Sequence, residues 1–230
     1  MKLQYLGDAK DSFKWDYIDH LAKELAFPTL AIFPMLTPND GGGHGGMPPE
    51  AFPSGKKMWE FCHELRRTGT IERLRDLPKH TEAAYAVILH KPHVYFKNQN
   101  RNVYFTGLAT ASRLLVFADP DNGFAPEVHV NEKHIRYDEV VNLLEKTSGD
   151  SVVTVFQHFR HKGFQVDFDQ IKKRLRLDGR PTAAIYATAI YWNGHLMFVT
   201  VGKSAEVIDG VATANRRYAE KRYPAVRAIQ

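Results

Sequence analysis

The sequence predicts an α/β fold with a mostly parallel sheet, helices on both faces and an antiparallel hairpin near the C-terminus. Apolar runs without alternation occur at 29–36, 114–118 and 151–156, and helical patterns lie between them. Continuous apolar strands of this kind are typical of parallel sheets that are covered on both faces. Two later apolar runs, 183–191 and 195–201, flank an Asn-Gly turn signal and indicate the closing hairpin.

The first helix is expected at Ser12–Ala26, because apolar residues recur on one face at intervals of four: Phe13, Tyr17, Leu21 and Leu25. Pro28 ends this pattern, and Thr29–Leu36 follows as a strand. A Gly/Pro-rich loop is expected at 37–55. The next segment, 56–90, begins with a helical pattern and is interpreted as a helical insertion.

The middle of the chain is expected to hold a hairpin formed by His93–Phe96 and Asn102–Phe105. Arg113–Ala118 and Ser151–Phe156 have the composition of buried strands, and Tyr137–Lys146 between them has a helical pattern. Further along, Phe168–Leu177 has the pattern of a basic amphipathic helix. The tail 215–230 is rich in arginine and lysine and is expected to be a surface helix.

Composition places the chain among globular proteins. Its 230 residues are 43% hydrophobic and 12% aromatic, which excludes disorder for most of the chain. We expect one domain over residues 1–230, located in the cytoplasm, because no apolar run has the roughly 20 residues that a membrane span needs. The single cysteine, Cys62, fits a reducing compartment and is expected to pack in a helix. A net charge of +5 is compatible with a nucleic-acid partner and with an ordinary enzyme.

The clearest candidate site is Asp119-Pro120-Asp121-Asn122-Gly123, directly after the buried strand 114–118. Ligands of open α/β sheets bind beyond the carboxyl ends of the strands, so a rigid polar turn at this point is aimed at the binding crevice. The turn could hold the Asp119 carboxylate and the Asn122 amide towards one ligand atom. The alternative is a plain turn that ends a strand, since these residue types are common in turns.

Two further segments could contribute to the same crevice. Near the N-terminus, Gly7 precedes a helix start that carries Lys10 and Lys14, which would favour an anion, although a solvated helix start is an equal alternative. After the strand 151–156, His158 could contact a substrate base or orient Asp119. Two basic residues follow it and could form a rim for phosphates: Arg160 and Lys162. A solvated strand end is the alternative here.

Several common chemistries find no support in the sequence. Six of the eleven histidines form three short pairs, but no cysteine cluster or His-Glu-x-x-His motif accompanies them, so we expect no metal site from them. The glycines at 41–46 are not followed by the Gly-Lys-Ser/Thr of a phosphate-binding loop. No Gly-x-Gly-x-x-Gly follows a strand, which argues against a dinucleotide-dependent dehydrogenase.

Two segments resemble small bacterial adenine-N6 methyltransferases that act on large-subunit ribosomal RNA, and the hairpin around Asn193-Gly194 is similar in kind to the reversed strand that closes the methyltransferase sheet. The opening Gly7-Asp8-Ala9-Lys10-Asp11-Ser12-Phe13-Lys14 resembles their Gly-(Asn/Asp)-x-x-Asp-x-x-Lys signature, and Asp119-Pro120-Asp121-Asn122 resembles their Asp-Pro-Pro-Tyr motif. The sequence is more similar to an uncharacterised bacterial and phage family that has Leu-Thr-Pro-Asp after a strand and a later Asp-Pro-Asp-Asn-Gly. Here these motifs are Leu36-Thr37-Pro38-Asn39 and 119–123.

The resemblance implies a class I, Rossmann-like methyltransferase fold with S-adenosylmethionine as cofactor. It places five residues along the cofactor cleft: Gly7, Asp8, Lys14, Thr37 and Asn39. It also implies that Asp119 and Pro120 form the catalytic motif, in which Asp119 accepts a hydrogen bond from the target amino group. Two positions depart from the motif, since Asp121 replaces its second proline and Asn122 replaces the aromatic residue that stacks on the base.

Three hypotheses of function follow. In the first, the chain is a methyltransferase acting on nucleic acid, Asp119 holds the target amine with help from His158, and phosphate is bound by Lys172, Lys173 and Arg174. In the second, the chain is a magnesium-dependent nuclease or phosphodiester enzyme that uses Asp8, Asp119 and Asp121. The third is a non-catalytic nucleic-acid-binding module on the same fold.

Overall fold

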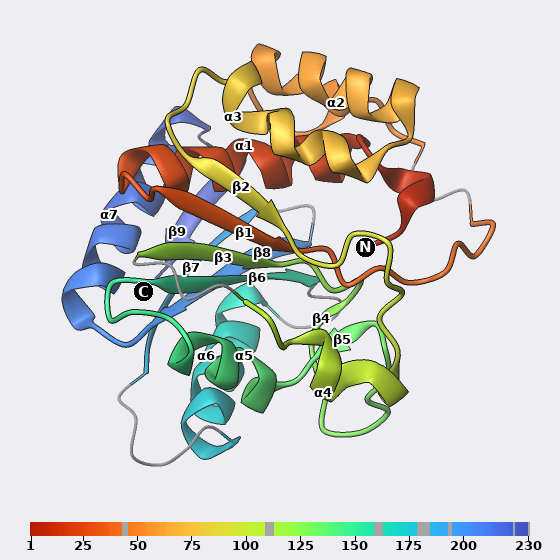
Figure 1. The fold of residues 1–230 in the computed structure, drawn as a ribbon. Coiled ribbons are helices and arrows are strands. Elements are labelled where there is room, and N and C mark those ends of the chain that lie inside the picture. Colours follow the sequence, from red (N-terminus) through yellow and green to blue (C-terminus); the bar gives the residue numbers. More distant parts are fainter. Residues whose placement is uncertain are drawn as a thin grey trace.

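A seven-stranded sheet forms the centre of the molecule (Figure 1). The computed structural model describes residues 1–42, 46–108, 113–158, 163–178, 185–192, 195–222 and 224–229. The strand order is β2-β1-β3-β6-β8-β7-β9. The bounds of these strands, in that order, are Ala86–Leu89, Thr29–Phe33, Leu114–Ala118, Val152–His158, Leu196–Gly202, Tyr186–Trp192 and Val226–Ile229.

The direction of the strands confirms the predicted fold class. β2, β1, β3 and β6 are parallel, whereas β8 is antiparallel to both β6 and β7 and lies between them. The predicted hairpin is therefore present as β7 and β8, and it inserts one reversed strand into a Rossmann-like sheet. β9 adds a further antiparallel strand at the edge beyond β7.

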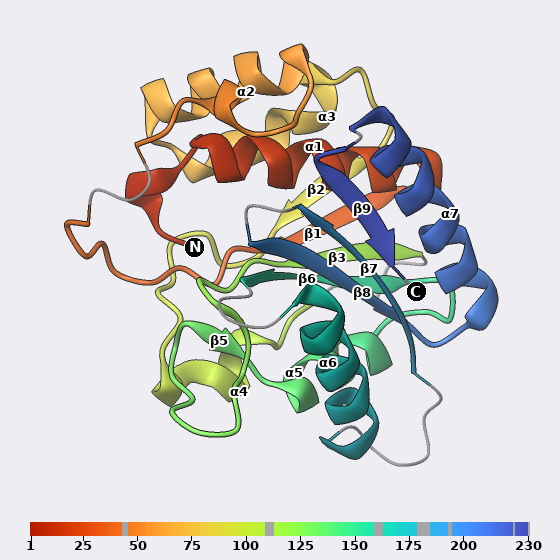
Figure 2. The same ribbon diagram turned by 180° about the vertical axis from the view of Figure 1, so that it is seen from behind.

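Helices cover both faces of the sheet, as Figures 1 and 2 show from opposite sides. One layer contains α1 (Ala9–Glu24), α2 (Lys56–Thr68), α3 (Leu77–His80) and α7 (Ala205–Lys221). The other contains α4 (Arg101–Tyr104), α5 (Tyr137–Glu145) and α6 (Phe164–Asp178). Side chains of β3 alternate between the two resulting cores: Leu115 and Phe117 pack beneath α1, whereas Val116 and Ala118 pack on the α5 and α6 side.

Short elements complete the chain between these layers. Four 3-10 helices occur at Leu3–Tyr5, Pro49–Ala51, Ile71–Asp76 and Asn98–Asn100 among the described residues. A small two-stranded sheet pairs β4 (Gly123–Phe124) with β5 (His134–Ile135). None of the described helices is long and apolar enough to cross a membrane.

Three expectations about secondary structure were wrong in detail. The segment 93–105 is no hairpin: Tyr95 bridges to Leu36, and a 3-10 helix followed by α4 brings Tyr104 into an aromatic cluster on β1. The segment 56–90 is helical only as far as His80, after which β2 joins the sheet. The C-terminal tail is no single helix, because α7 ends at Lys221 and the chain returns as β9.

Candidate functional site

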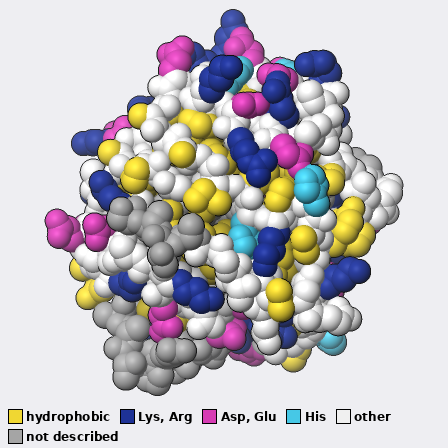
Figure 3. Space-filling model, viewed as in Figure 1, with side chains coloured by type: hydrophobic (Ala, Val, Ile, Leu, Met, Phe, Trp, Pro, Cys, Tyr) yellow, Lys and Arg dark blue, Asp and Glu magenta, His cyan; other side chains and the backbone are white. Residues whose placement is uncertain are grey.

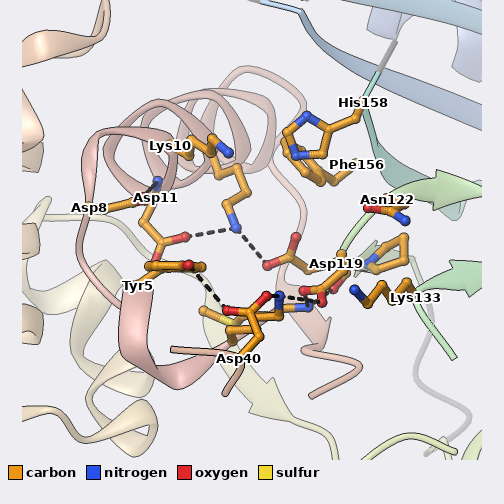
Figure 4. Close-up of a pocket in the computed structure, with 15 residues that line it drawn as sticks. Tyr5, Asp8, Lys10, Asp11, Asp40, Asp119, Asn122, Lys133, Phe156 and His158 are labelled. Atoms are coloured by element: carbon orange, nitrogen blue, oxygen red, sulfur yellow. Dashed lines mark hydrogen bonds and ion pairs between the residues drawn. The ribbon is translucent and has the colours of Figure 1, made fainter. Parts of the chain in front are cut away.

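A cleft of about 410 Å³ lies at the carboxyl ends of β1, β3 and β6, next to the first turn of α1 (Figure 4). This is the edge of the sheet where open α/β folds bind their ligands. The volume falls within the range of about 300–1,000 Å³ that is usual for small-molecule sites. The cleft brings together predicted residues from three separate segments: Asp8 and Lys14, the turn 119–122, and His158.

The centre of the cleft wall is a buried ion-pair network around Lys14. The Lys14 Nζ lies 2.7 Å from Asp119 Oδ2 and 2.7 Å from Asp11 Oδ1. All three side chains are at most 6% exposed. The backbone amide of Gly7 donates a hydrogen bond of 2.9 Å to the other oxygen of Asp11. The network therefore fixes the position and orientation of the Asp119 carboxylate.

The second carboxylate oxygen of Asp119, Oδ1, is buried and has no hydrogen-bond partner among the described residues. Figure 4 shows the Asp119 side chain among the residues that line the cleft. A buried carboxylate oxygen without a donor is costly, and native proteins usually satisfy such atoms. Because Asp119 lines the cleft, an N–H or O–H group of a ligand that enters beside it is the candidate donor for Oδ1.

Burial and neighbouring charge shift the pKa values of this network. Burial opposes the charged form of Lys14, but Asp11 and Asp119 outweigh it and raise the pKa of the ammonium, which stays protonated. Burial also raises the pKa of Asp119, and the Lys14 charge limits that rise. Burial and the charge of Asp11 raise the pKa of Asp8 to about 7, although the Asp8 side chain caps α1 by accepting from the Asp11 amide.

The turn after β3 is held in place from both sides. The N-terminal amine of Met1 lies 2.7 Å from Asp121 Oδ1 and donates a 3.0 Å hydrogen bond to the Asp119 carbonyl. Thr37 also donates to Asp121. On the other side, the His158 amide donates to the Asn122 carbonyl at 3.2 Å, and a Cβ at position 123 would lie 2.0 Å from the Gln157 side chain. Position 123 therefore requires glycine, as its φ of 107° also indicates.

Three residues that the resemblance assigns to the cofactor are not among those that line the cleft. Gly7 packs against α2, and a Cβ there would lie 2.2 Å from the Cys62 carbonyl. Thr37 bonds to Asp121, and Asn39 accepts from the Gln4 amide at 3.3 Å. Asp8 and Lys14 do line the cleft, but the Lys14 ammonium already forms ion pairs with Asp11 and Asp119.

None of the predicted phosphate-binding residues that the structure describes lines the cleft. Arg160 and Lys162 lie outside the described residues. Lys172, Lys173 and Arg174 lie on α6, where Lys173 and Arg174 line a different groove of about 750 Å³ together with Phe124 and Tyr137. Figure 3 shows Lys and Arg side chains scattered among acidic and apolar ones over the described part of one face, not gathered in one patch.

Sequence reasoning missed Asp11, Asp40, Lys133 and Phe156. The signal for Asp11 is its spacing: residues 8, 11 and 14 follow each other at intervals of three, so Asp11 and Lys14 share one face of the helix. Lys133 comes from the connection between β4 and β5, and Phe156 lies under the Lys14 ammonium at 5.0 Å from ring centre to Nζ. Nothing in the local sequence marks these two residues.

The described residues contain no group of three His, Cys, Asp or Glu side chains that could hold a metal ion. The carboxylates of the nuclease hypothesis have other partners: Asp8 caps α1, Asp119 pairs with Lys14, and Asp121 pairs with the N-terminal amine. Comparison of the chain with protein-family models, curated proteins and solved structures finds no match.

Proposed function

We propose that this protein is an S-adenosylmethionine-dependent methyltransferase whose acceptor is an amino group of a nucleic acid or nucleotide. The observation that carries the proposal is Asp119, which lines the cleft at the end of β3 and whose buried Oδ1 has no hydrogen-bond partner among the described residues. The reversed strand β8 between β6 and β7, and the Asp-Pro pair at the end of β3, give further support through the resemblance described above.

In this proposal the cofactor occupies the part of the cleft near α1 and the loop after β1. The carboxylates of Asp8 and Asp40 could accept hydrogen bonds from the ammonium and hydroxyl groups of the cofactor. The ring of Tyr5 provides an apolar surface for the cofactor to pack against. The unpartnered Asp119 oxygen fits a reaction in which an N–H group must be held next to the cofactor. When bound, S-adenosylmethionine would supply an electrophilic methyl group and keep the electron pair of the broken carbon–sulfur bond on sulfur.

The residues of the chain then act on the acceptor. Asp119 Oδ1 accepts a hydrogen bond from the acceptor N–H, which directs the nitrogen lone pair away from the carboxylate. When the nitrogen gains its fourth bond it must lose a proton, and the Asp119 carboxylate is placed to receive it. Lys14 holds Oδ2 throughout, so the carboxylate cannot rotate away from the acceptor.

Transfer of tritiated methyl groups from S-adenosylmethionine to RNA and DNA oligonucleotides tests the proposal. We expect micromolar binding of the cofactor by calorimetry and transfer to one class of acceptor. Asp119→Ala should retain cofactor binding but lose transfer by roughly 10²- to 10⁴-fold, the usual range for a group that assists proton transfer. Asp169→Ala, on the exposed surface of α6, is the control. Absence of binding at millimolar cofactor, or undiminished transfer by Asp119→Ala, would overturn it.

A further inference from the structure

Two lysines of the cleft form no ion pair with a described residue. The other cations there are paired: Lys14 with Asp11 and Asp119, Lys2 with Asp40, and the N-terminal amine with Asp121. Lys10 and Lys133 also line the cleft, yet neither ammonium forms a hydrogen bond or ion pair with a described residue. Both side chains are half-buried, so neither has the full hydration of a surface lysine.

The two ammonium groups face the cleft from opposite walls (Figure 4). Lys10 lies on the first turn of α1, four residues before Lys14 and on the same helix face. The Lys133 backbone is fixed to the Asp119 turn, because its carbonyl accepts from the Asn122 amide at 2.9 Å. Its own amide donates to the Asn131 side chain at 3.0 Å. The backbones of both lysines are therefore held at fixed positions beside the cleft.

Two kinds of interaction are therefore unfilled among the described residues: Asp119 Oδ1 has no hydrogen-bond donor, and the ammonium groups of Lys10 and Lys133 have no ion-pair partner. Burial is the largest influence on Lys10 and lowers the pKa of its ammonium, while Asp8 and Asp11 act in the opposite direction. An anion that contacts Lys10 would restore the interactions that burial removes. A single ligand that carries both an N–H group and a phosphate would satisfy both requirements.

We propose that Lys10 and Lys133 form an anion subsite for phosphate groups of the acceptor, so that the methyl acceptor is a nucleotide or nucleic-acid strand held by its phosphates inside this cleft. This inference rests on the proposed function for the identity of the acceptor. It differs from the sequence-based hypothesis, which assigned phosphate binding to α6 and to residues after β6.

Calorimetric binding of AMP and of adenosine, which differ only in the phosphate, tests the subsite. We expect AMP to bind about tenfold more tightly than adenosine, the size of one charge-assisted hydrogen bond. In Lys10→Met and in Lys133→Met this preference should shrink severalfold, with adenosine affinity unchanged. Lys56→Met is the control, because Lys56 is 82% exposed on α2. A short single-stranded oligoadenylate should show the same loss and a shallower salt dependence in both cleft variants.

A second pair of ligands separates the phosphate of the acceptor from the carboxylate of the cofactor. S-adenosylhomocysteine carries that carboxylate, and methylthioadenosine lacks it. If Lys10→Met or Lys133→Met weakens only S-adenosylhomocysteine, the lysine serves the cofactor and the inference is wrong. Equal affinity for AMP and adenosine in the unaltered protein also overturns it. Either result contradicts the anion subsite but leaves the proposed methyl transfer unaffected. Conversely, a preference for AMP over adenosine in a protein that does not bind S-adenosylmethionine would support the subsite and contradict the proposed methyltransferase activity.

Discussion

Replacing Lys14 by methionine should destabilise the protein far more than the loss of one charge on its surface. Methionine keeps most of the apolar stem but removes the ammonium that lies 2.7 Å from each of two buried carboxylates. Removing one partner of a buried ion pair costs about 3–5 kcal/mol, because it leaves an uncompensated charge. We therefore expect the free energy of unfolding at pH 7 to fall by about that amount.

The control is Lys23→Met on the same helix. Lys23 pairs with Asp19 at 2.8 Å, but its side chain is 38% exposed, so its loss should cost at most about 1 kcal/mol. Urea unfolding followed by circular dichroism measures both variants. Adding Asp119→Asn to Lys14→Met removes the charge of one of the two carboxylates that have lost their ammonium partner. The double variant should therefore recover at least about 1 kcal/mol of the free energy of unfolding.

The penalty of Lys14→Met should also depend on pH. Without the ammonium, the folded-state pKa of Asp119 lies further above that of the unfolded chain, so the folded variant binds a proton that the unfolded chain has lost. The unfolded chain then binds fewer protons, and stability falls as pH rises. The cost should be smaller at pH 5 than at pH 8. If Lys14→Met lowers the free energy of unfolding by no more than Lys23→Met does, the ammonium of Lys14 does not stabilise the buried Asp119 carboxylate and the reasoning is refuted.

Three other expectations concern the same region. Burial and the charge of Asp11 raise the pKa of Asp8 to about 7, whereas an ordinary aspartate has a pKa of about 3.9, so stability should fall as the pH rises from 4 to 7, by on the order of 1–4 kcal/mol. Asp8→Asn keeps the cap and should flatten this slope in urea titrations at several pH values. Gly7→Ala should lower the melting temperature more than Gly69→Ala: both have positive φ, but a Cβ at position 7 would lie 2.2 Å from the Cys62 carbonyl and one at position 69 would contact nothing. Arg101→Met should cost about 3–5 kcal/mol in urea unfolding, because Arg101 is 3% exposed and pairs with Glu139, whereas Arg217→Met on the surface should cost under about 1 kcal/mol.

Five of the seven strands of the central sheet were predictable because each is a short apolar run that is visible in the sequence: β1, β3, β6, β7 and β8. The edge strands β2 and β9 were not, because they lie in segments that were expected to be helical. The edge of the sheet that carries the site was predictable from the apolar runs, since Asp119 and His158 come at the ends of two of them. The pairing of Lys14 with Asp119 was not, because the two residues are 105 positions apart and only the packing of α1 over β3 brings them together.

The errors in secondary structure have a common physical origin. Phe96, Tyr104 and Phe105 belong to two short segments with the composition of strands, but they are buried against one another and against Phe33, and a short helix achieves this packing equally well. The sequence suggests that Gly7 belongs to an anion-binding turn. In the structure, its missing side chain instead permits the backbone to approach α2 closely. Such tertiary contacts leave no periodic signal in the local sequence.

The buried triad of Asp11, Lys14 and Asp119 also bears on function. Well-packed apolar residues in place of a buried ion pair are often neutral or stabilising, so burial of these three charges is not explained by stability alone. The triad uses three of the four carboxylate oxygens within Asp11 and Asp119 and leaves one, Asp119 Oδ1, without a donor. The two bonds of the Lys14 ammonium, to Asp11 and to Asp119, fix the direction in which Asp119 Oδ1 points. Asp119 is one of the residues that line the cleft. The hydrogen bonds of this network orient one acceptor, Asp119 Oδ1, that has no donor among the described residues. A ligand that donates a hydrogen bond to this oxygen would explain why the network is present.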